Sequence, residues 1–181
     1  NDSASVIQIK DVATNQNTGS ARVQREVAAL NNFDYVYWST PVETFDVANV
    51  SPSTPYYGMF EWIPTVDNGS AGKHGEWTYA SGNMALGQGY AIRDLEGTPL
   101  ADNAEFEGKL NNGQITHYIT RGTYNGGNYA GIGNTSNAED DNWNLMGNPY
   151  PSAISLTAFT SANPYIDGTL YFWRHTAAPS T

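Results

Sequence analysis

The sequence predicts an all-β protein: an antiparallel β-sandwich of jelly-roll-like arrangement, with one short helix near residues 155–162. Apolar residues recur at every second position in many short runs, which is the period of a β-strand. Gly, Pro and Asn separate these runs at short intervals, as turns between strands do. The 181 residues are enough to bury one core, and no linker divides them.

The predicted strands follow one another with short connections. In the third run, Tyr35 and Tyr37 point to one face and Val36 to the other. The sequence Asn111-Asn112-Gly113 between two alternating runs predicts a hairpin. The first two runs are expected to pair as a hairpin or to form successive rungs. The expected strands are residues 6–9, 21–27, 33–38, 56–63, 76–80, 89–95, 106–110, 114–121 and 168–175.

The one predicted helix begins after Ser155, whose hydroxyl can cap it, and ends at Asn163-Pro164. Leu156 and Phe159 share its apolar face. We expect the whole chain to divide into three parts. Residues 1–30 form an N-terminal β-hairpin or the end of a preceding β-repeat region, residues 31–176 form the β-sandwich module, and residues 177–181 form a tail.

Charge and cysteine content exclude several classes of function. Eight basic residues against eighteen acidic ones give a formal charge of −10 and a pI near 4.4, so we expect no nucleic-acid partner. No run approaches the roughly 20 apolar residues of a membrane span, so we expect no membrane insertion. The absence of cysteine excludes disulfides and cysteine-ligated metals. Low charge (14%) with many aromatic residues (13%) is typical of extracellular or cell-surface β proteins.

The sequence carries no motif of an enzyme. A G-x-S-x-G nucleophile motif is missing. His74, His117 and His175 are far apart and do not have the spacing of zinc ligands. A glycosidase needs only two facing carboxylates, and nothing in the sequence singles out such a pair. We therefore expect a protein without catalytic residues, with a hydrolase as the least favoured reading.

The densest acidic cluster is a candidate calcium site. Glu139, Asp140, Asp141 and Asn142 offer the carboxylate and amide oxygens that calcium binds. The spacing differs from that of an EF-hand loop, and a solvated acidic loop explains the same residues. Calcium is thus a possible cofactor.

Aromatic residues around one predicted loop suggest a carbohydrate-binding surface. Trp62 and Trp77 flank the loop at 64–75, and Tyr56, Tyr57 and Tyr79 lie close to them in sequence. Aromatic rings stack on sugars, and Asn or Asp side chains at the rim bind hydroxyl groups. The competing interpretation is that these rings fill the core. We take Trp62, Trp77, Tyr56 and Tyr79 as the candidate ligand-binding residues.

Several segments in one order carry a resemblance to a known kind of module. The most specific segment is Trp143-Asn144-Leu145-Met146-Gly147-Asn148-Pro149-Tyr150-Pro151-Ser152-Ala153-Ile154. The others are Asp34-Tyr35-Val36-Tyr37-Trp38-Ser39-Thr40-Pro41-Val42, Met84 with Gly87-Gln88-Gly89-Tyr90-Ala91-Ile92-Arg93, Phe106-Glu107-Gly108 with Asn111-Asn112-Gly113, and Ile166-Asp167-Gly168-Thr169-Leu170-Tyr171-Phe172-Trp173. Together they resemble a module of Bacteroidetes (flavobacterial) cell-surface and adhesin-like proteins that the type IX secretion system exports.

This resemblance implies an extracellular or cell-surface location and a chain that is a fragment of a larger protein. It implies no catalytic residues. We expect a non-enzymatic module for surface display or adhesion, whose partners are a surface glycan, another extracellular molecule or the rest of the parent polypeptide. The alternative is a carbohydrate-binding, lectin-like module, assisted by calcium. Exposure of the tryptophans distinguishes the two.

Overall fold

The computed structural model describes residues 6–8, 12–27, 33–66, 75–95, 103–123, 129–131, 134–136, 142–166 and 170–172. Over these residues the protein is mostly β with one short helix, which confirms the all-β class. The strands are β1 (Ala21–Glu26), β2 (Tyr35–Trp38), β3 (Met59–Ile63), β4 (Glu76–Tyr79), β5 (Tyr90–Arg93), β6 (Asn103–Gly108), β7 (Tyr129–Gly131) and β8 (Asn134–Ser136). The helical elements are η1 (Val47–Asn49), η2 (Tyr56–Gly58) and α1 (Leu156–Ala162).

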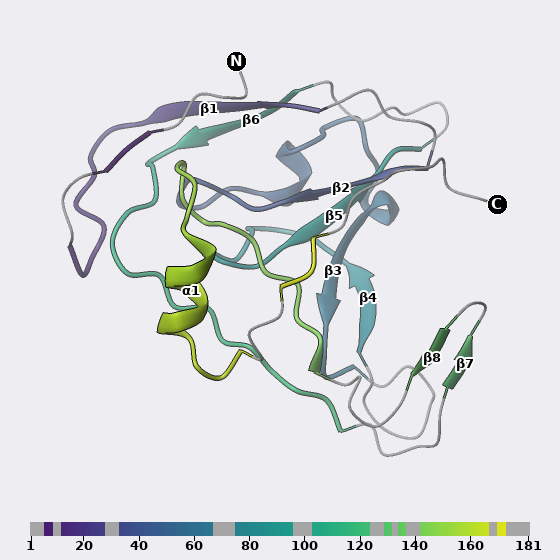
Figure 1. Cartoon of the computed structure of the whole chain (residues 1–181). Helices are drawn as coiled ribbons and strands as arrows, with labels where there is room; N and C mark the ends of the chain where they lie inside the picture. The colour runs from purple at the N-terminus through teal and green to yellow at the C-terminus, as the bar shows by residue number, and fades with distance from the viewer. Residues whose placement is uncertain are drawn as a thin grey trace.

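The described strands pair in antiparallel fashion. Four form a sheet in the order β2-β5-β3-β4, and β1 pairs with β6. β7 and β8 make a separate hairpin. Figure 1 shows β1 and β6 side by side across the top of the molecule, with β2 and β5 beneath them and α1 to the left.

The apolar core contains side chains from the four-stranded sheet and from the β1-β6 pair. Phe106 of β6 is 1% exposed, and its ring centroid lies 4.7 Å from that of Phe45 and 6.0 Å from that of Trp38. Val23 of β1 and Ile92 of β5 join the same cluster. The other buried members are Val42, Val47, Val50, Met59, Ala80, Met84, Tyr90 and Ala104. Burial of these side chains is the main stabilising contribution to the fold.

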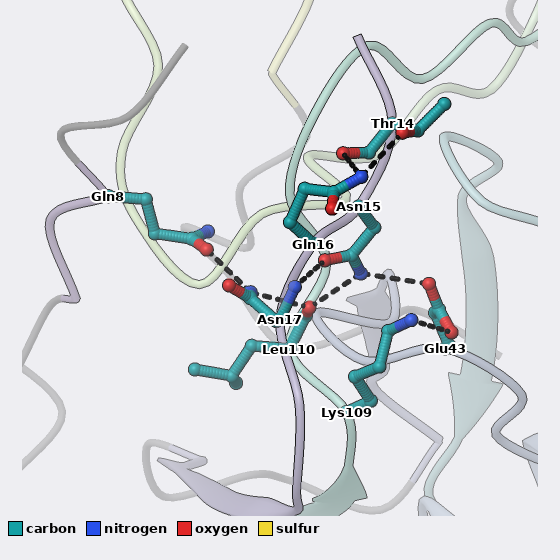
Figure 2. A network of polar contacts seen from close by, with 8 residues as sticks. All are labelled: Gln8, Thr14, Asn15, Gln16, Asn17, Glu43, Lys109 and Leu110. Atoms are coloured by element: carbon teal, nitrogen blue, oxygen red, sulfur yellow. Dashed lines mark hydrogen bonds and ion pairs between the residues drawn. The ribbon is translucent and has the colours of Figure 1, made fainter. Parts of the chain in front are cut away.

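Amide side chains attach the N-terminal segment to the chain after β6. Asn15 Nδ2 donates to the Leu110 carbonyl at 2.8 Å and to Glu43 Oε1 at 2.8 Å, and Asn17 Nδ2 donates to the same carbonyl at 2.9 Å. Lys109 forms an ion pair with Glu43 at 3.1 Å. Figure 2 shows both amides converging on Leu110. The segment before β1 is thus held by side-chain hydrogen bonds to the chain after β6 and to Glu43.

The predicted hairpin at residues 111–113 is wrong. β6 pairs with β1, and the structure has no strand in residues 114–121. Asn111 is 1% exposed, and its Nδ2 donates to the carbonyls of Thr40 at 3.1 Å and Pro149 at 2.8 Å. The sequence predicts a hairpin turn here, whereas the buried Asn111 amide joins two segments that are distant in sequence. β1 likewise pairs with β6 rather than with residues 6–8, which are not in a strand.

Two other predicted strands differ from the observed elements. The expected strand at 56–63 begins as η2 before continuing as β3. Of the expected strand at 168–175, the structure describes residues 170–172, and these are not in a strand.

Helix α1 confirms the predicted helix. The Ser155 hydroxyl accepts a hydrogen bond from the Ala158 N–H at 3.3 Å, which satisfies one donor of the first turn. Asn163 ends the helix, and its Nδ2 donates to the Phe159 carbonyl at 2.7 Å. In the part of the chain that the structure describes, no helix has the length and apolar character to cross a membrane.

The Asn148-Pro149-Tyr150-Pro151 sequence forms a turn with its own hydrogen bonds. Asn148 Oδ1 accepts from the Tyr150 N–H at 3.0 Å, and Asn148 Nδ2 donates to the Ser152 carbonyl at 2.7 Å. The Tyr150 hydroxyl donates to the Gly113 carbonyl at 2.7 Å. These contacts give the motif a structural role, since they fix the turn and fasten it to the segment after β6.

Candidate functional site

The strand register places aromatic side chains on one face of the four-stranded sheet. In β5, Tyr90 and Ile92 belong to the core, so Ala91 and Arg93 point to the opposite face. Residues paired directly with them, and those two positions further along each strand, share that face. We call it the aromatic face; its members are Tyr35, Tyr37, Phe60, Trp62, Trp77, Tyr79, Ala91 and Arg93.

The four predicted binding residues lie together as a row. The ring centroids of Tyr56 and Tyr79 are 5.5 Å apart, and those of Trp62 and Trp77 are 5.6 Å apart. Tyr79 and Trp77 occupy alternate positions of β4, about 7 Å apart along the strand. Tyr56, Tyr79, Trp77 and Trp62 are called the aromatic row below. The four residues that the sequence predicts as ligand-binding therefore lie next to one another in the fold.

Three members of the aromatic row are exposed to solvent. Tyr56 is 68% exposed, Tyr79 57% and Trp77 41%. Tyr57 is 52% exposed, and its ring centroid lies 5.6 Å from that of Tyr56, so it extends the row. Trp77 and Tyr79 are exposed because β4 is an edge strand of its sheet. Tyr56 is exposed because it lies in η2, before the first residue of β3.

Trp62 is half-buried and is fixed from two sides. A Cβ built at Gly75 would lie 2.4 Å from the Trp62 ring, and Gly75 has a φ of +93°, so glycine is required there. The Trp62 indole N–H donates to the Trp143 carbonyl at 2.8 Å. Beyond it, the rings of Trp143 and Tyr171 are 5.0 Å apart and both residues are exposed. A second aromatic pair therefore lies near the Trp62 end of the row.

Rings from β2 close over the middle of the aromatic face. Tyr37 lies 6.4 Å from Trp77, and Tyr35 lies 6.1 Å from Phe60, measured between ring centroids. Ala91 beneath them is 1% exposed. Burial, and next the neighbouring Tyr35, raises the pKa of the Tyr37 phenol above its ordinary value of 10.0. A tyrosine phenol is protonated at neutral pH even at its ordinary pKa, so the Tyr37 hydroxyl can donate a hydrogen bond.

The candidate calcium residues fall mostly outside the described residues, which do not include Glu139, Asp140 and Asp141. Asn142 is exposed, and its carbonyl accepts a hydrogen bond from Asn144 Nδ2 at 3.0 Å. Within the described ranges, no three His, Asp or Glu side chains gather in a group that could hold a metal ion. Of the histidines, His117 is described, whereas His74 and His175 are not.

A hollow of about 550 Å³ is lined by other residues than the aromatic row. Its walls come largely from the Asn148 turn and from the end of β2. The indole N–H of Trp38 and the hydroxyl of Ser39 belong to this lining and are buried with no hydrogen-bond partner. The remaining lining residues are Arg25, Tyr37, Pro41, Gly89, Phe106, Leu145, Met146, Gly147, Tyr150, Pro151, Ser152 and Ala153.

Sequence reasoning missed Phe60 and Arg93 as members of the aromatic face. The signal was present for β2, where Tyr35 and Tyr37 alternate with Val36. What the sequence lacks is the strand order, which alone shows that β2 and β4 share a sheet with β5 and β3 between them.

The fold and this face define a β domain with a surface of exposed aromatic side chains. The chain belongs to the family described as Domain of unknown function (DUF8693), whose model matches residues 1–181. Neither the curated proteins nor the solved structures contain a significant match to this sequence.

Proposed function

We propose that this domain is a non-enzymatic carbohydrate-binding module and that the aromatic row is its binding surface. The exposure of Tyr56, Tyr79 and Trp77 next to one another is the observation that carries the proposal. Exposed aromatic side chains that touch one another form an apolar strip, and apolar strips on protein surfaces often mark binding sites.

Carbohydrate fits this surface better than a purely apolar ligand. A sugar ring presents C–H groups on its face and hydroxyl groups at its edge. The rings of the row supply the stacking surface, and the phenol hydroxyls of Tyr56 and Tyr79 supply donors and acceptors beside it. Tyr79 and Trp77 lie about 7 Å apart along the strand, close enough for one oligosaccharide to contact both rings.

The proposal includes the setting in which such a module works. A glycan-binding module on an exported bacterial surface protein acts as an adhesin, so surface display and lectin activity are parts of one role. The core shared by β1-β6 and the four-stranded sheet supports the jelly-roll-like sandwich as the underlying architecture. Calcium assistance through the loop at Glu139 remains a prediction, and a binding assay in calcium and in EDTA tests it.

Affinity electrophoresis in gels that contain single polysaccharides tests the proposal. We expect retardation of the folded protein by at least one polysaccharide, and loss of about tenfold or more in affinity on Trp77→Ala or Tyr79→Ala. Tyr165→Ala is the matched control, because Tyr165 is 93% exposed but lies after α1, outside the row.

Equal loss in Tyr165→Ala would show that any exposed ring contributes and would contradict a defined site. Retardation that persists in a Trp77→Ala, Tyr79→Ala double variant would place the binding surface elsewhere. A folded protein that no polysaccharide retards would contradict the proposed function itself.

A further inference from the structure

Arg93 provides a positive charge at one end of the aromatic face. It lies on β5 opposite Tyr35 of β2. Its guanidinium carbon is 4.9 Å from the ring centroid of Phe33 and 5.5 Å from that of Tyr35. Cations over aromatic rings at these distances are attracted by the electrons of the ring face. The two rings therefore hold the guanidinium in place before any ligand arrives.

The guanidinium lacks an acidic partner among the described residues. The ion pairs there are those of Arg22 with Glu105 and Glu107 and of Lys109 with Glu43. Arg93 is half-buried, and its Nε is buried without a hydrogen-bond partner. Because Nε is covered, an acceptor from solvent would have to reach the guanidinium through its two terminal nitrogens.

Contacts between rings connect Arg93 to the aromatic row. The Arg93 guanidinium lies over the ring of Tyr35. The ring centroids of Tyr35 and Phe60 are 6.1 Å apart, and those of Phe60 and Tyr79 are 5.6 Å apart. Arg93 is also the one charged residue of the aromatic face. A ligand stacked on Tyr79 and extending toward β2 would meet this charge.

We propose that Arg93 forms a subsite for an anionic group on the bound glycan, either the carboxylate of a uronic acid or a sulfate ester. This inference rests on the proposed function. Guanidinium recognises both groups through two parallel N–H donors. Because Nε is covered, the anion binds end-on, through the two terminal nitrogens.

The net charge of the protein disfavours binding of glycans with a high density of anionic groups. At a net charge of −10, the protein repels a dense polyanion at long range. A single prearranged cation beside neutral stacking rings suits a glycan with one acidic unit per several sugars. The same reasoning disfavours nucleic acid, whose charge recurs at every nucleotide.

The test compares acidic polysaccharides with neutralised forms of the same chain. The carboxylate pair is glucuronoxylan, which carries one uronic acid per several sugars, with its carboxyl-reduced form. The sulfate pair is lightly sulfated agar with its desulfated form. Binding is measured for the wild type, Arg93→Gln and Arg93→Lys. Arg22→Gln is the matched control, because it removes the same charge from β1, away from the aromatic face.

We expect the acidic member of at least one pair to bind about tenfold more tightly than its neutral form. Arg93→Gln should reduce the ratio of acidic to neutral affinity to about one, Arg93→Lys should restore part of the preference, and Arg22→Gln should keep it. Preference in the carboxylate or in the sulfate pair identifies the anion.

The inference fails if acidic and neutral forms bind equally, or if Arg93→Gln weakens both forms alike while circular dichroism shows a folded domain. The proposed function survives these results, provided that Trp77→Ala still weakens binding of the neutral form by about tenfold or more. Absence of binding to every polysaccharide overturns both.

Discussion

The two faces of the four-stranded sheet are both rich in large side chains, yet they differ in what covers them. On the core face, Tyr90 is 5% exposed and Ile92 is fully buried under residues from β1 and β6. On the aromatic face, Tyr79 is 57% and Trp77 41% exposed. An apolar surface that folding leaves in water is retained at a cost in solubility, so the difference favours a binding role for the aromatic face.

The largest difference in stability is expected between truncating a ring of the core and truncating a ring of the aromatic face. Phe106→Ala removes a ring that is 1% exposed and packs on Phe45, so we expect it to lower the free energy of unfolding by about 3–5 kcal/mol. Tyr79→Ala, in contrast, should cost about 1 kcal/mol, because its ring contacts are partly solvated. Urea denaturation followed by far-ultraviolet circular dichroism measures both. Equal losses would mean that the aromatic face is a second core.

A smaller effect is expected where the segment after Asn144 meets residues just before β5 and just after β2. The Gly147 N–H donates to the Gly87 carbonyl at 3.0 Å, and a Cβ at Gly147 would lie 2.3 Å from the Cβ of Ser39. Gly147→Ala should therefore lower the free energy of unfolding by about 1–3 kcal/mol. Gly82→Ala is a comparison in which nothing lies within 4 Å of the added carbon, although its φ of +75° adds strain of its own. A Gly147→Ala domain no less stable than Gly82→Ala would contradict the close contact.

The smallest effect concerns His117, which packs against Gly87. Burial lowers its pKa below the ordinary 6.5, and the hydrogen bond to Leu86 offsets only part of this. The unfolded chain then binds the proton more readily, so the free energy of unfolding should be unaffected above pH 6.5 and should decrease as the pH falls below it.

His117→Gln should remove this part of the pH dependence. The measurement is the urea midpoint at about pH 7.5 and about pH 5.5, a range in which ordinary carboxyl groups stay ionised. A midpoint difference as large in His117→Gln as in the wild type would show that another group is responsible.

The sequence was sufficient for local features and for the identity of the aromatic row. Alternation in β2 and β4 fixed which side chains share a face, and Ser155 and Asn163 fixed the ends of α1. It was not sufficient for Asn111, because local preference for a turn says nothing about distant carbonyls that a buried amide can reach. Arg93 was missed for the same reason, since its place beside Tyr35 and Phe33 depends on strand pairing.

The pairing of β1 with β6 has a consequence for how the chain folds. Arg22 and Glu107, which face each other in this pair, are 85 positions apart, whereas β3 and β4 are neighbours in sequence and pair across one connection. Closing a long loop loses more chain entropy than closing a short one, and non-local pairing slows folding. The β3-β4 hairpin, with Trp77 and Tyr79 on it, can thus form early and locally. We expect the core to be completed later, when β1 and β6 meet, and the apolar strip to be in place before that step.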